Sequence, residues 1–237
     1  SMTARGICEK GNVREENQDS ILIRIRKNSG LFIVADGVGG ALYGAQASRY
    51  LTDSFSLWWD TFFMEHFDSS FDQIFDNAKM FTEELNRDLI TQYGMGECCS
   101  TIALLLVHKK LFGCLSAGDS RIYTCDRIGA RQITRDDIWE NQPNLGGHSP
   151  YEGKILSAVG ALDSLEYSCI TDRAERGMSF LLCSDGIYKY VLPELISMNL
   201  KDARRKPLLR DRNIRRLAEA AQEAGTDDNY SLIMVKA

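Results

Sequence analysis

The sequence predicts an α+β domain in which layers of largely antiparallel sheet are covered by helices. Short apolar runs typical of strands occur near both ends of the chain and in its middle. Two longer segments with apolar residues at helical spacing separate the first strands from the middle ones. The middle strands follow one another across turns too short for the crossover that parallel strands need. At 237 residues, the chain is long enough to bury a substantial core as one domain, residues 1–237.

The strands are expected where apolar or β-branched residues are bounded by turn formers. Residues 31–35 form a continuous apolar run of the kind found in fully buried strands. Residues 101–133 read as a meander of four strands. The complete set of expected strands is residues 3–8, 20–26, 31–35, 101–108, 111–116, 120–125, 130–133, 168–171, 179–183 and 230–235.

Two long helices and two shorter ones are expected between these strands. The long ones cover residues 41–59 and 70–93, where apolar side chains recur at i, i+3 and i+4. The shorter ones cover residues 192–198 and 210–224. An aromatic group at the end of the first helix is interpreted as core rather than as a ligand-binding box. Its members are Trp58, Trp59, Phe62 and Phe63.

Composition excludes several classes of protein. No apolar run approaches the roughly 18 residues of a membrane helix, and no secretory signal is visible, so a cytoplasmic protein without membrane association is expected. The seven cysteines include no CxxC pair and are interpreted as reduced, buried thiols. Three widely spaced histidines disfavour zinc. The net charge of −5 makes nucleic acid an unlikely partner.

Two polar segments carry open interpretations. Residues 134–155 are rich in Gly, Asn and Pro and are expected to form a surface segment. Residues 201–216 are strongly basic. They could dock an acidic partner or a nucleic acid, but a solvated loop and helix face is favoured, because acidic residues dilute the run and no aromatics interleave with it.

Four aspartates stand where apolar runs begin or end. Asp36, Asp119 and Asp185 each follow such a run, and Asp228 precedes one, with Gly or Asn close by. Single Asp and Gly residues often mark turns. Four of them at strand ends instead favour carboxylate and carbonyl oxygens that converge on a hard divalent cation such as Mg²⁺ or Mn²⁺.

Other chemistries fit these motifs less well. Gly37, Gly39 and Gly40 lack the glycine spacing of a dinucleotide fingerprint, and Asp36 would repel a pyrophosphate. There is no GxSxG motif, and Cys183 ends an apolar run, which is typical of a buried thiol. Covalent catalysis is therefore disfavoured.

Six motifs occur along the chain in the order seen in one known family. They are Arg14-Glu-Glu-Asn17-Gln18-Asp19, Val34-Ala-Asp36-Gly37-Val-Gly39-Gly40, Ser100-Thr101, Gly118-Asp119-Ser120-Arg121, Cys183-Ser184-Asp185-Gly186 and Asp228-Asn229. In this order, the chain resembles the metal-dependent protein phosphatase 2C (PPM) family over residues 3–235, and the bacterial-type members in particular. The resemblance implies a four-layer α-β-β-α sandwich of two mainly antiparallel sheets with a binuclear Mn²⁺ or Mg²⁺ site at one end.

The resemblance also implies roles for individual residues. Asp36 would bridge both metals, and the Gly37 carbonyl would bind the first. Asp185 and Asp228 would hold the second. Asp119, with Asp185, would hold a third, more weakly bound ion. The remaining two residues support the site: Asp19 through a water on the first metal, and Arg14 by binding the substrate phosphate.

The implied activity is hydrolysis of phosphoserine and phosphothreonine monoesters by a metal-bridging hydroxide. The implied partners are phosphoproteins and a cognate serine/threonine kinase. Two alternatives stay open: a non-catalytic pseudophosphatase that serves as a binding module, and a metal-dependent phosphohydrolase acting on a non-protein phosphoester, for which the basic residues 201–216 are the main support.

The chain departs from the family pattern at three places. Gln18 stands where many relatives have Glu, which removes a negative charge near the first metal. Val38 stands where eukaryotic members carry a His, which leaves protonation of the leaving group to a water on a metal. The flap-like segment 134–155 begins with Asp136-Asp137 in place of Asp-His and is shorter than usual, and Trp139 within it is either a substrate contact or a loop-packing residue.

Overall fold

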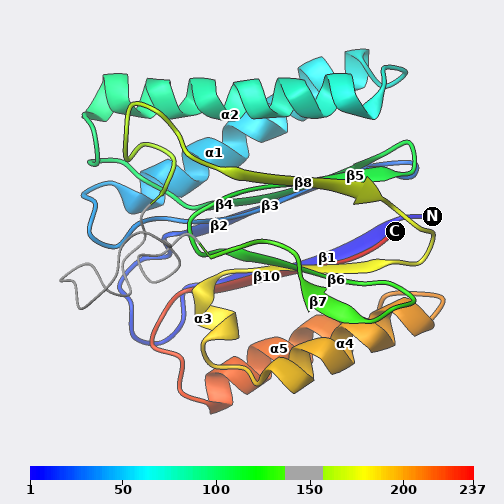
Figure 1. The fold of residues 1–237 in the computed structure, drawn as a ribbon. Helices are drawn as coiled ribbons and strands as arrows, with labels where there is room; N and C mark the ends of the chain where they lie inside the picture. The colour runs from blue at the N-terminus through cyan, green and yellow to red at the C-terminus, as the bar shows by residue number, and fades with distance from the viewer. Residues whose placement is uncertain (137–156) are drawn as a thin grey trace, which may run out of the picture.

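Two five-stranded sheets pack face to face, and helices cover their outer faces (Figure 1). The computed structural model describes residues 1–136 and 157–237. The first sheet has the order β1 (Thr3–Glu9), β10 (Tyr230–Lys236), β9 (Ser179–Cys183), β6 (Arg121–Cys125) and β7 (Ala130–Gln132). The second has the order β2 (Asp19–Arg26), β3 (Ser29–Asp36), β4 (Ile102–His108), β5 (Leu111–Ala117) and β8 (Ser168–Arg173). Neighbouring strands pair antiparallel, and the predicted four-layer α-β-β-α sandwich is confirmed.

The helices fall into two groups, one on each sheet (Figure 1). The second sheet is covered by α1 (Gly44–Trp58) and α2 (Phe71–Tyr93), with the π-helical turn η1 (Trp59–Phe63) directly after α1. The first sheet is covered by α3 (Asp185–Tyr188), α4 (Pro193–Arg205) and α5 (Asp211–Glu223). Among the residues that the structure describes, no helix is both long and apolar enough to cross a membrane.

The core has three layers, one between the two sheets and one between each sheet and its helices. Side chains alternate along a strand, so one strand can contribute to two of these layers. In β3, Leu31 and Ile33 pack in the core beneath α1 and α2, whereas Phe32 and Val34 pack between the two sheets. A strand buried on both faces therefore reads as a continuous apolar run, as β3 does. Fully burying one such side chain stabilises the fold by roughly 1.5–3 kcal/mol.

The predicted meander over residues 101–133 is wrong. The hairpins β4–β5 and β6–β7 belong to different sheets, and the chain crosses between them at Gly118, Asp119 and Ser120. Gly118 has φ +101°, and a Cβ there would lie 2.6 Å from Cγ2 of Thr101. This left-handed turn redirects the chain, so that Asp119 lies between the sheets rather than in a loop on one of them.

The other corrections concern helices. The helix predicted over residues 41–59 begins at Gly44, and it passes into η1, where Trp59 stacks on Phe63 at 3.9 Å. The helix predicted to end at residue 198 continues to Arg205, because Leu200 and Ala203 extend its buried face. Its last turn carries Arg204 and Arg205, and positive charge there complements the helix dipole.

The aromatic and cysteine predictions can also be compared with the structure. The aromatic group is core, as predicted, with Trp58, Trp59 and Phe63 buried. All seven cysteines are free among the described residues, and five of them are buried as predicted. Cys8 is only half-buried, and Cys169, on the edge strand β8, is exposed. Trp139 and most of the flap-like segment lie outside the described residues.

Candidate metal centre

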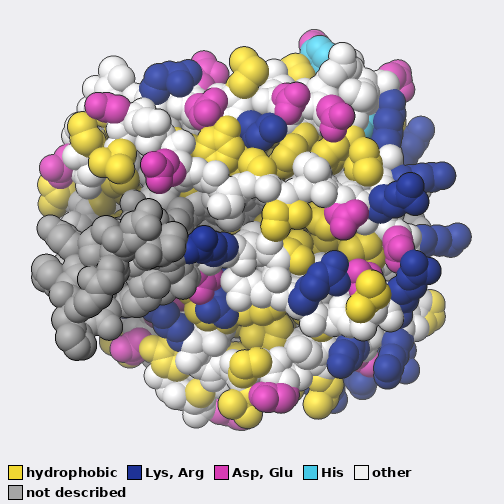
Figure 2. Space-filling view, in the orientation of Figure 1, with side chains coloured by type: hydrophobic (Ala, Val, Ile, Leu, Met, Phe, Trp, Pro, Cys, Tyr) yellow, Lys and Arg dark blue, Asp and Glu magenta, His cyan; other side chains and the backbone are white. Residues whose placement is uncertain are grey.

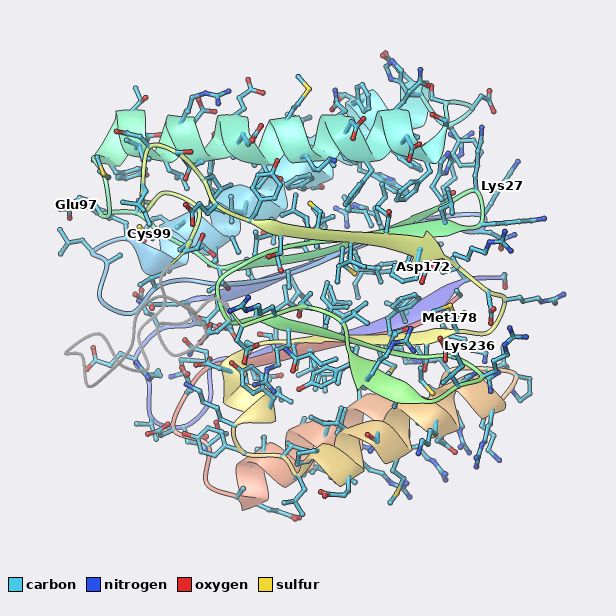
Figure 3. All side chains as sticks on the ribbon, in the orientation of Figure 1. Lys27, Glu97, Cys99, Asp172, Met178 and Lys236 are labelled. Carbon is cyan, nitrogen blue, oxygen red and sulfur yellow. The ribbon has the colours of Figure 1, made fainter. Side chains whose placement is uncertain are left out.

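All five predicted aspartates lie at strand ends on one end of the sandwich. Asp19 begins β2 and Asp36 ends β3, so each lies where a strand leaves the core. Asp119 lies where the chain crosses between the sheets, and Asp185 follows β9 as the first residue of α3. Asp228 closely precedes β10. In Figure 1 this is the end of the sheets next to α3, and Figure 3 labels Cys99 at the same end.

Asp19 is a buried carboxylate held by two serines. Its side chain accepts hydrogen bonds at Oδ2 from Ser184 Oγ at 3.0 Å and from Ser231 Oγ at 2.7 Å. The residue is only 6% exposed. Burial, assisted by the charge of Asp185, raises the pKa of Asp19 to about 6, although the two serine bonds act in the opposite direction.

Asp36 is positioned through its backbone. Its N–H donates to Thr101 Oγ1 at 3.0 Å, and the Thr101 N–H donates back to the Asp36 carbonyl at 2.9 Å. Thr101 also shares a hydrogen bond of 2.7 Å with Ser120 Oγ. Burial and the charges of Asp19 and Asp185 raise the pKa of the Asp36 carboxyl well above its ordinary value.

Two glycines let neighbouring backbones approach this end closely. A Cβ on Gly37 would lie 2.3 Å from the Gly44 carbonyl oxygen at the start of α1. A Cβ on Gly186 would lie 1.9 Å from the Asn229 carbonyl oxygen. No side chain fits at either distance, so both positions, each directly after a predicted aspartate, require glycine.

Asp185 interacts with every other aspartate of the group. Its charge raises the pKa values of Asp19, Asp36, Asp119 and Asp228. Oδ2 of Asp185 pairs with the Lys189 ammonium at 3.2 Å, and its buried Oδ1 has no hydrogen-bond partner in the described part of the chain. The five carboxylates are thus linked electrostatically through one residue.

Asp119 is the second buried carboxylate with an unsatisfied oxygen. It is 5% exposed, and its Oδ1 finds no donor within the described ranges. Burial and the charge of Asp185 raise its pKa to about 7. The Tyr188 hydroxyl donates to the Asp119 carbonyl at 2.8 Å, which ties α3 to the crossing between the sheets.

Arg14 and Asp228 lie together at the rim of the group. Arg14 NH2 is 3.6 Å from Asp228 Oδ1, and Arg14 Nε donates to the Asp227 carbonyl at 3.2 Å. The Arg14 side chain is 51% exposed, so a ligand can reach the guanidinium from solvent. Burial and the charge of Asp185 raise the Asp228 pKa, and Arg14 opposes them.

Asn229 anchors the loop that carries Arg14. Its Oδ1 accepts from the Gln18 N–H at 3.0 Å, and its Nδ2 donates to the carbonyls of Lys10 and Glu16 at 2.8 and 2.9 Å. The residue is buried. Gln18 in turn accepts at its carbonyl from the Gly37 N–H, so the loop, β3 and β10 are joined at one point.

The donor set fits divalent cations. Asp19, Asp119 and Asp185 each hold one buried carboxylate oxygen without a hydrogen-bond partner among the described residues. An unsatisfied buried oxygen is destabilising by roughly 1–3 kcal/mol, which coordination would relieve. As the side chains stand, no three His, Cys, Asp or Glu of residues 1–136 and 157–237 form a closed ligand group. The aspartates interact pairwise around Asp185 instead.

Ser231 and Lys189 were not predicted as residues of this site, and Thr101 and Ser184, which occur in the sequence motifs, were predicted without a role. Ser184, Ser231 and Thr101 bond the aspartates or their backbones, and Lys189 pairs with Asp185. The sequence could have predicted the Lys189–Asp185 pair, because Lys189 lies four residues after Asp185, which is the spacing of a helical ion pair. No sequence pattern predicts the contact of Ser231 with Asp19, since that contact depends on how the two sheets pack.

Asp136 at the start of the flap-like segment is held by Arg121. The guanidinium donates from Nε to Asp136 Oδ1 at 2.9 Å and from NH2 to Oδ2 at 2.6 Å. The Arg121 guanidinium also stacks over the Tyr188 ring, 3.6 Å from its centroid. Arg121 thus connects the start of this segment to α3.

The basic residues 201–216 lie away from the aspartates. They occupy the end of α4 and the start of α5, and Figure 2 shows Lys and Arg side chains gathered at the end of the molecule opposite the acidic motifs. Arg210 and Arg212 pair with Asp202 at 2.9 and 3.8 Å. Part of this charge is therefore neutralised within the segment.

Comparisons with known proteins agree with this geometry. A family model described as Protein phosphatase 2C matches residues 12–224. A putative protein phosphatase of Mycoplasma genitalium is 27% identical over 220 residues, covering 84% of this chain and 85% of that protein. PppA, a key regulatory component of T6SS in Pseudomonas aeruginosa, superposes with a TM-score of 0.82 at 28% identity over 100% of this chain and 97% of PppA.

A further solved structure is the catalytic domain of the serine/threonine protein phosphatase PstP in complex with 2 manganese ions. It matches 99% of this chain and 97% of its own length with a TM-score of 0.76 and 24% identity, so it supports the fold. The family match covers most of the sequence, including Arg14, Asp19, Asp36, Asp119 and Asp185. The chain therefore belongs to the protein phosphatase 2C family of metal-dependent serine/threonine phosphatases.

Proposed function

We propose that this protein hydrolyses phosphoserine and phosphothreonine monoesters of proteins at a centre of two Mn²⁺ or Mg²⁺ ions, with residues 1–237 acting as one catalytic domain. The observation that carries the proposal is the position of Asp185. It interacts with four other aspartates and keeps one buried oxygen without a donor in the described residues. That arrangement is costly without cations and suited to binding them.

The donor atoms would divide between the two ions in the way that the family resemblance implies. Asp36 would contact both ions, and the Gly37 carbonyl would complete the first. Asp185 and Asp228 would hold the second, and Asp19 would act through a water. When bound, two such ions lower the pKa of water towards neutrality and offset the charge of a phosphoryl group. The two manganese ions of the PstP catalytic domain support this number.

The protein's own residues orient the substrate and the ligands. The exposed face of Arg14 can donate to phosphate oxygens in a forked geometry that suits a phosphomonoester. Asn229 holds the loop that carries it, and Thr101 holds the backbone of Asp36. Ser184 and Ser231 keep Asp19 in one orientation, and its other carboxylate oxygen has no hydrogen-bond partner in the part of the chain that the structure describes.

Catalysis is favoured over the two alternatives. A non-catalytic binding module would have no use for buried carboxylates with unsatisfied oxygens, which destabilise a fold that binds no metal. A nucleic-acid substrate is disfavoured because the basic residues 201–216 lie where α4 ends and α5 begins, at the other end of these helices from α3 (Figure 1), and are partly paired with Asp202. The expected partners are phosphoproteins and the serine/threonine kinase that forms them.

The experiment that tests this proposal compares substrate classes. Phosphate release is measured from a phosphothreonine peptide, a phosphotyrosine peptide and a 5′-phosphorylated oligonucleotide, each with Mn²⁺ and with excess EDTA. The proposal expects Mn²⁺-dependent release that is fastest from the phosphothreonine peptide. Faster release from the oligonucleotide would show that the substrate is a non-protein phosphoester. Release that persists in EDTA would rule out the metal centre.

A further inference from the structure

Lys189 places a positive charge at the solvent-exposed edge of the acidic group. It follows α3 directly, four residues after Asp185, and its ammonium lies 3.2 Å from Asp185 Oδ2. The pair is not a remote surface contact, because only 16% of the Asp185 side chain is exposed. The Lys189 side chain itself is 56% exposed, so it reaches the group from the solvent side.

The charge of Lys189 acts on more than its direct partner. It interacts favourably with Asp119 and Asp228 as well as with Asp185. At Asp119 it is the attractive charge that opposes the repulsion from Asp185. Asp228 has a second cation nearby, because Arg14 NH2 lies 3.6 Å from its Oδ1. Among the described residues, Lys189 is therefore a cation that acts on both Asp119 and Asp185.

The contacts made by α3 hold Lys189 close to Asp119 and Asp185. α3 is a single turn that begins with Asp185, and the Tyr188 hydroxyl fastens it to the Asp119 carbonyl at 2.8 Å. The Arg121 guanidinium stacks on the Tyr188 ring and is itself held by Asp136. The backbone at Lys189 consequently cannot move away from Asp119 without breaking these contacts.

We propose that the Lys189 ammonium takes the place of a third divalent cation at Asp119 and Asp185, so that the centre holds two metal ions and not three. This inference rests on the proposed two-metal function. Oδ1 of Asp119 is buried and has no hydrogen-bond partner within residues 1–136 and 157–237, and it marks the place that such an ion would otherwise fill. A tethered ammonium competes there at a high local concentration that a free ion must overcome.

The proposal makes Lys189 a residue that sets the number of bound metals. An incoming divalent cation at Asp119 and Asp185 would have to displace the ammonium or tolerate its repulsion. Removing the charge should therefore strengthen binding of the weakest ion by at least about tenfold. The first ion should be affected much less, because it would depend on Asp36 and the Gly37 carbonyl, neither of which Lys189 contacts directly.

The test counts bound Mn²⁺ by equilibrium dialysis and isothermal titration calorimetry at near-neutral pH. Wild type, Lys189→Met, Lys189→Arg and the double variant Lys189→Met/Asp119→Asn are compared. Lys206→Met, at an exposed lysine directly after α4, is the matched control for loss of one positive charge. Far-ultraviolet circular dichroism and a melting curve confirm that each variant folds.

We expect two Mn²⁺ ions in wild type, Lys189→Arg and the control. Lys189→Met should bind a third ion, and the double variant should lose it again. Three ions in wild type, or the same number and affinity in wild type and Lys189→Met, would overturn this inference and leave the two-metal centre standing. Absence of Mn²⁺ binding in every protein would overturn the proposed function itself, and the inference with it.

Discussion

Asp19 and Asp36 lie directly opposite each other in the antiparallel register of β2 and β3. They are the first residue of one strand and the last of the next, so two carboxylates meet where the sheet ends. Like charges that face each other across a strand pair are destabilising. At an effective dielectric of 20, two carboxylates about 5 Å apart repel by roughly 3 kcal/mol. The fold tolerates this arrangement at the one end where cations are proposed to bind.

Mn²⁺ should raise the melting temperature of the wild-type protein. Cations that bind the folded state but not the unfolded chain stabilise it by mass action, by about 2.7 kcal/mol at a hundred times the dissociation constant. Differential scanning fluorimetry with and without millimolar Mn²⁺ measures the shift. Asp36→Asn should show a much smaller shift. An unchanged wild-type melting temperature would argue against an assembled metal centre.

Without metal, the protein should become less stable as the pH rises from about 4 to about 7. Folding raises the pKa of Asp19 to about 6 and of Asp119 to about 7, against ordinary values near 4. In this window the folded protein binds more protons than the unfolded chain, so the free energy of unfolding falls with rising pH. A pKa difference of one corresponds to about 1.4 kcal/mol.

Urea denaturation in EDTA at several pH values between 4 and 8 checks this dependence. The Asp19→Asn/Asp119→Asn variant is the control, because it lacks both titrating groups and should show a flatter profile. Saturating Mn²⁺ should remove or reverse the trend, since the cations favour the ionised carboxylates. A wild-type stability that increases steadily over this window in EDTA would contradict the account.

Arg14→Ala should raise KM for a phosphothreonine peptide about tenfold or more and change kcat much less. The guanidinium is half exposed beside Asp228, where it can bind phosphate without touching the leaving group. Steady-state kinetics at saturating Mn²⁺ separate the two constants. Arg49→Ala, at an exposed position on α1, is the matched control. An unchanged KM in Arg14→Ala would remove Arg14 from the substrate site.

Asn229→Ala should lower the free energy of unfolding by about 2 kcal/mol or more. The substitution leaves the Gln18 N–H and the carbonyls of Lys10 and Glu16 without their buried partner. It should also raise KM, because the loop that carries Arg14 loses its anchor. Chemical denaturation and kinetics measure both effects. Asn12→Ala, at an exposed position in the same loop, should change neither.

The layers of the fold could be predicted from the sequence, because the burial of a strand or helix determines its local pattern of apolar residues. The run of residues 31–35 indicates a strand covered on both faces, and β3 packs against both cores. The meander failed because residues 111–125 show two good strands and a short polar connection, which fits a hairpin equally well. Only the crossing at Gly118, which needs φ +101° and close approach to Thr101, separates the two arrangements.

At the site, too, local sequence patterns predicted the aspartates but not the residues that contact them from distant parts of the chain. Aspartates at strand ends are visible in the sequence, and the structure brings all five to one end. The residues that hold them come from distant segments: Ser231 lies 212 positions from Asp19, and Thr101 lies 65 from Asp36. No local periodicity encodes such contacts. The roles of Arg14, Asp36 and Asp228 towards metal or substrate remain predictions for experiment.

The most direct test of the central claim is phosphate release by Asp185→Asn. Mn²⁺-dependent turnover of a phosphothreonine peptide is measured for wild type, for this variant and for Asp53→Asn, an exposed control on α1. Because Asp185 links all the aspartates of the group, its loss should lower kcat at least about a hundredfold, some 2.7 kcal/mol of barrier. Asp53→Asn should match wild type. Near-native turnover by a folded Asp185→Asn protein would contradict the proposed centre.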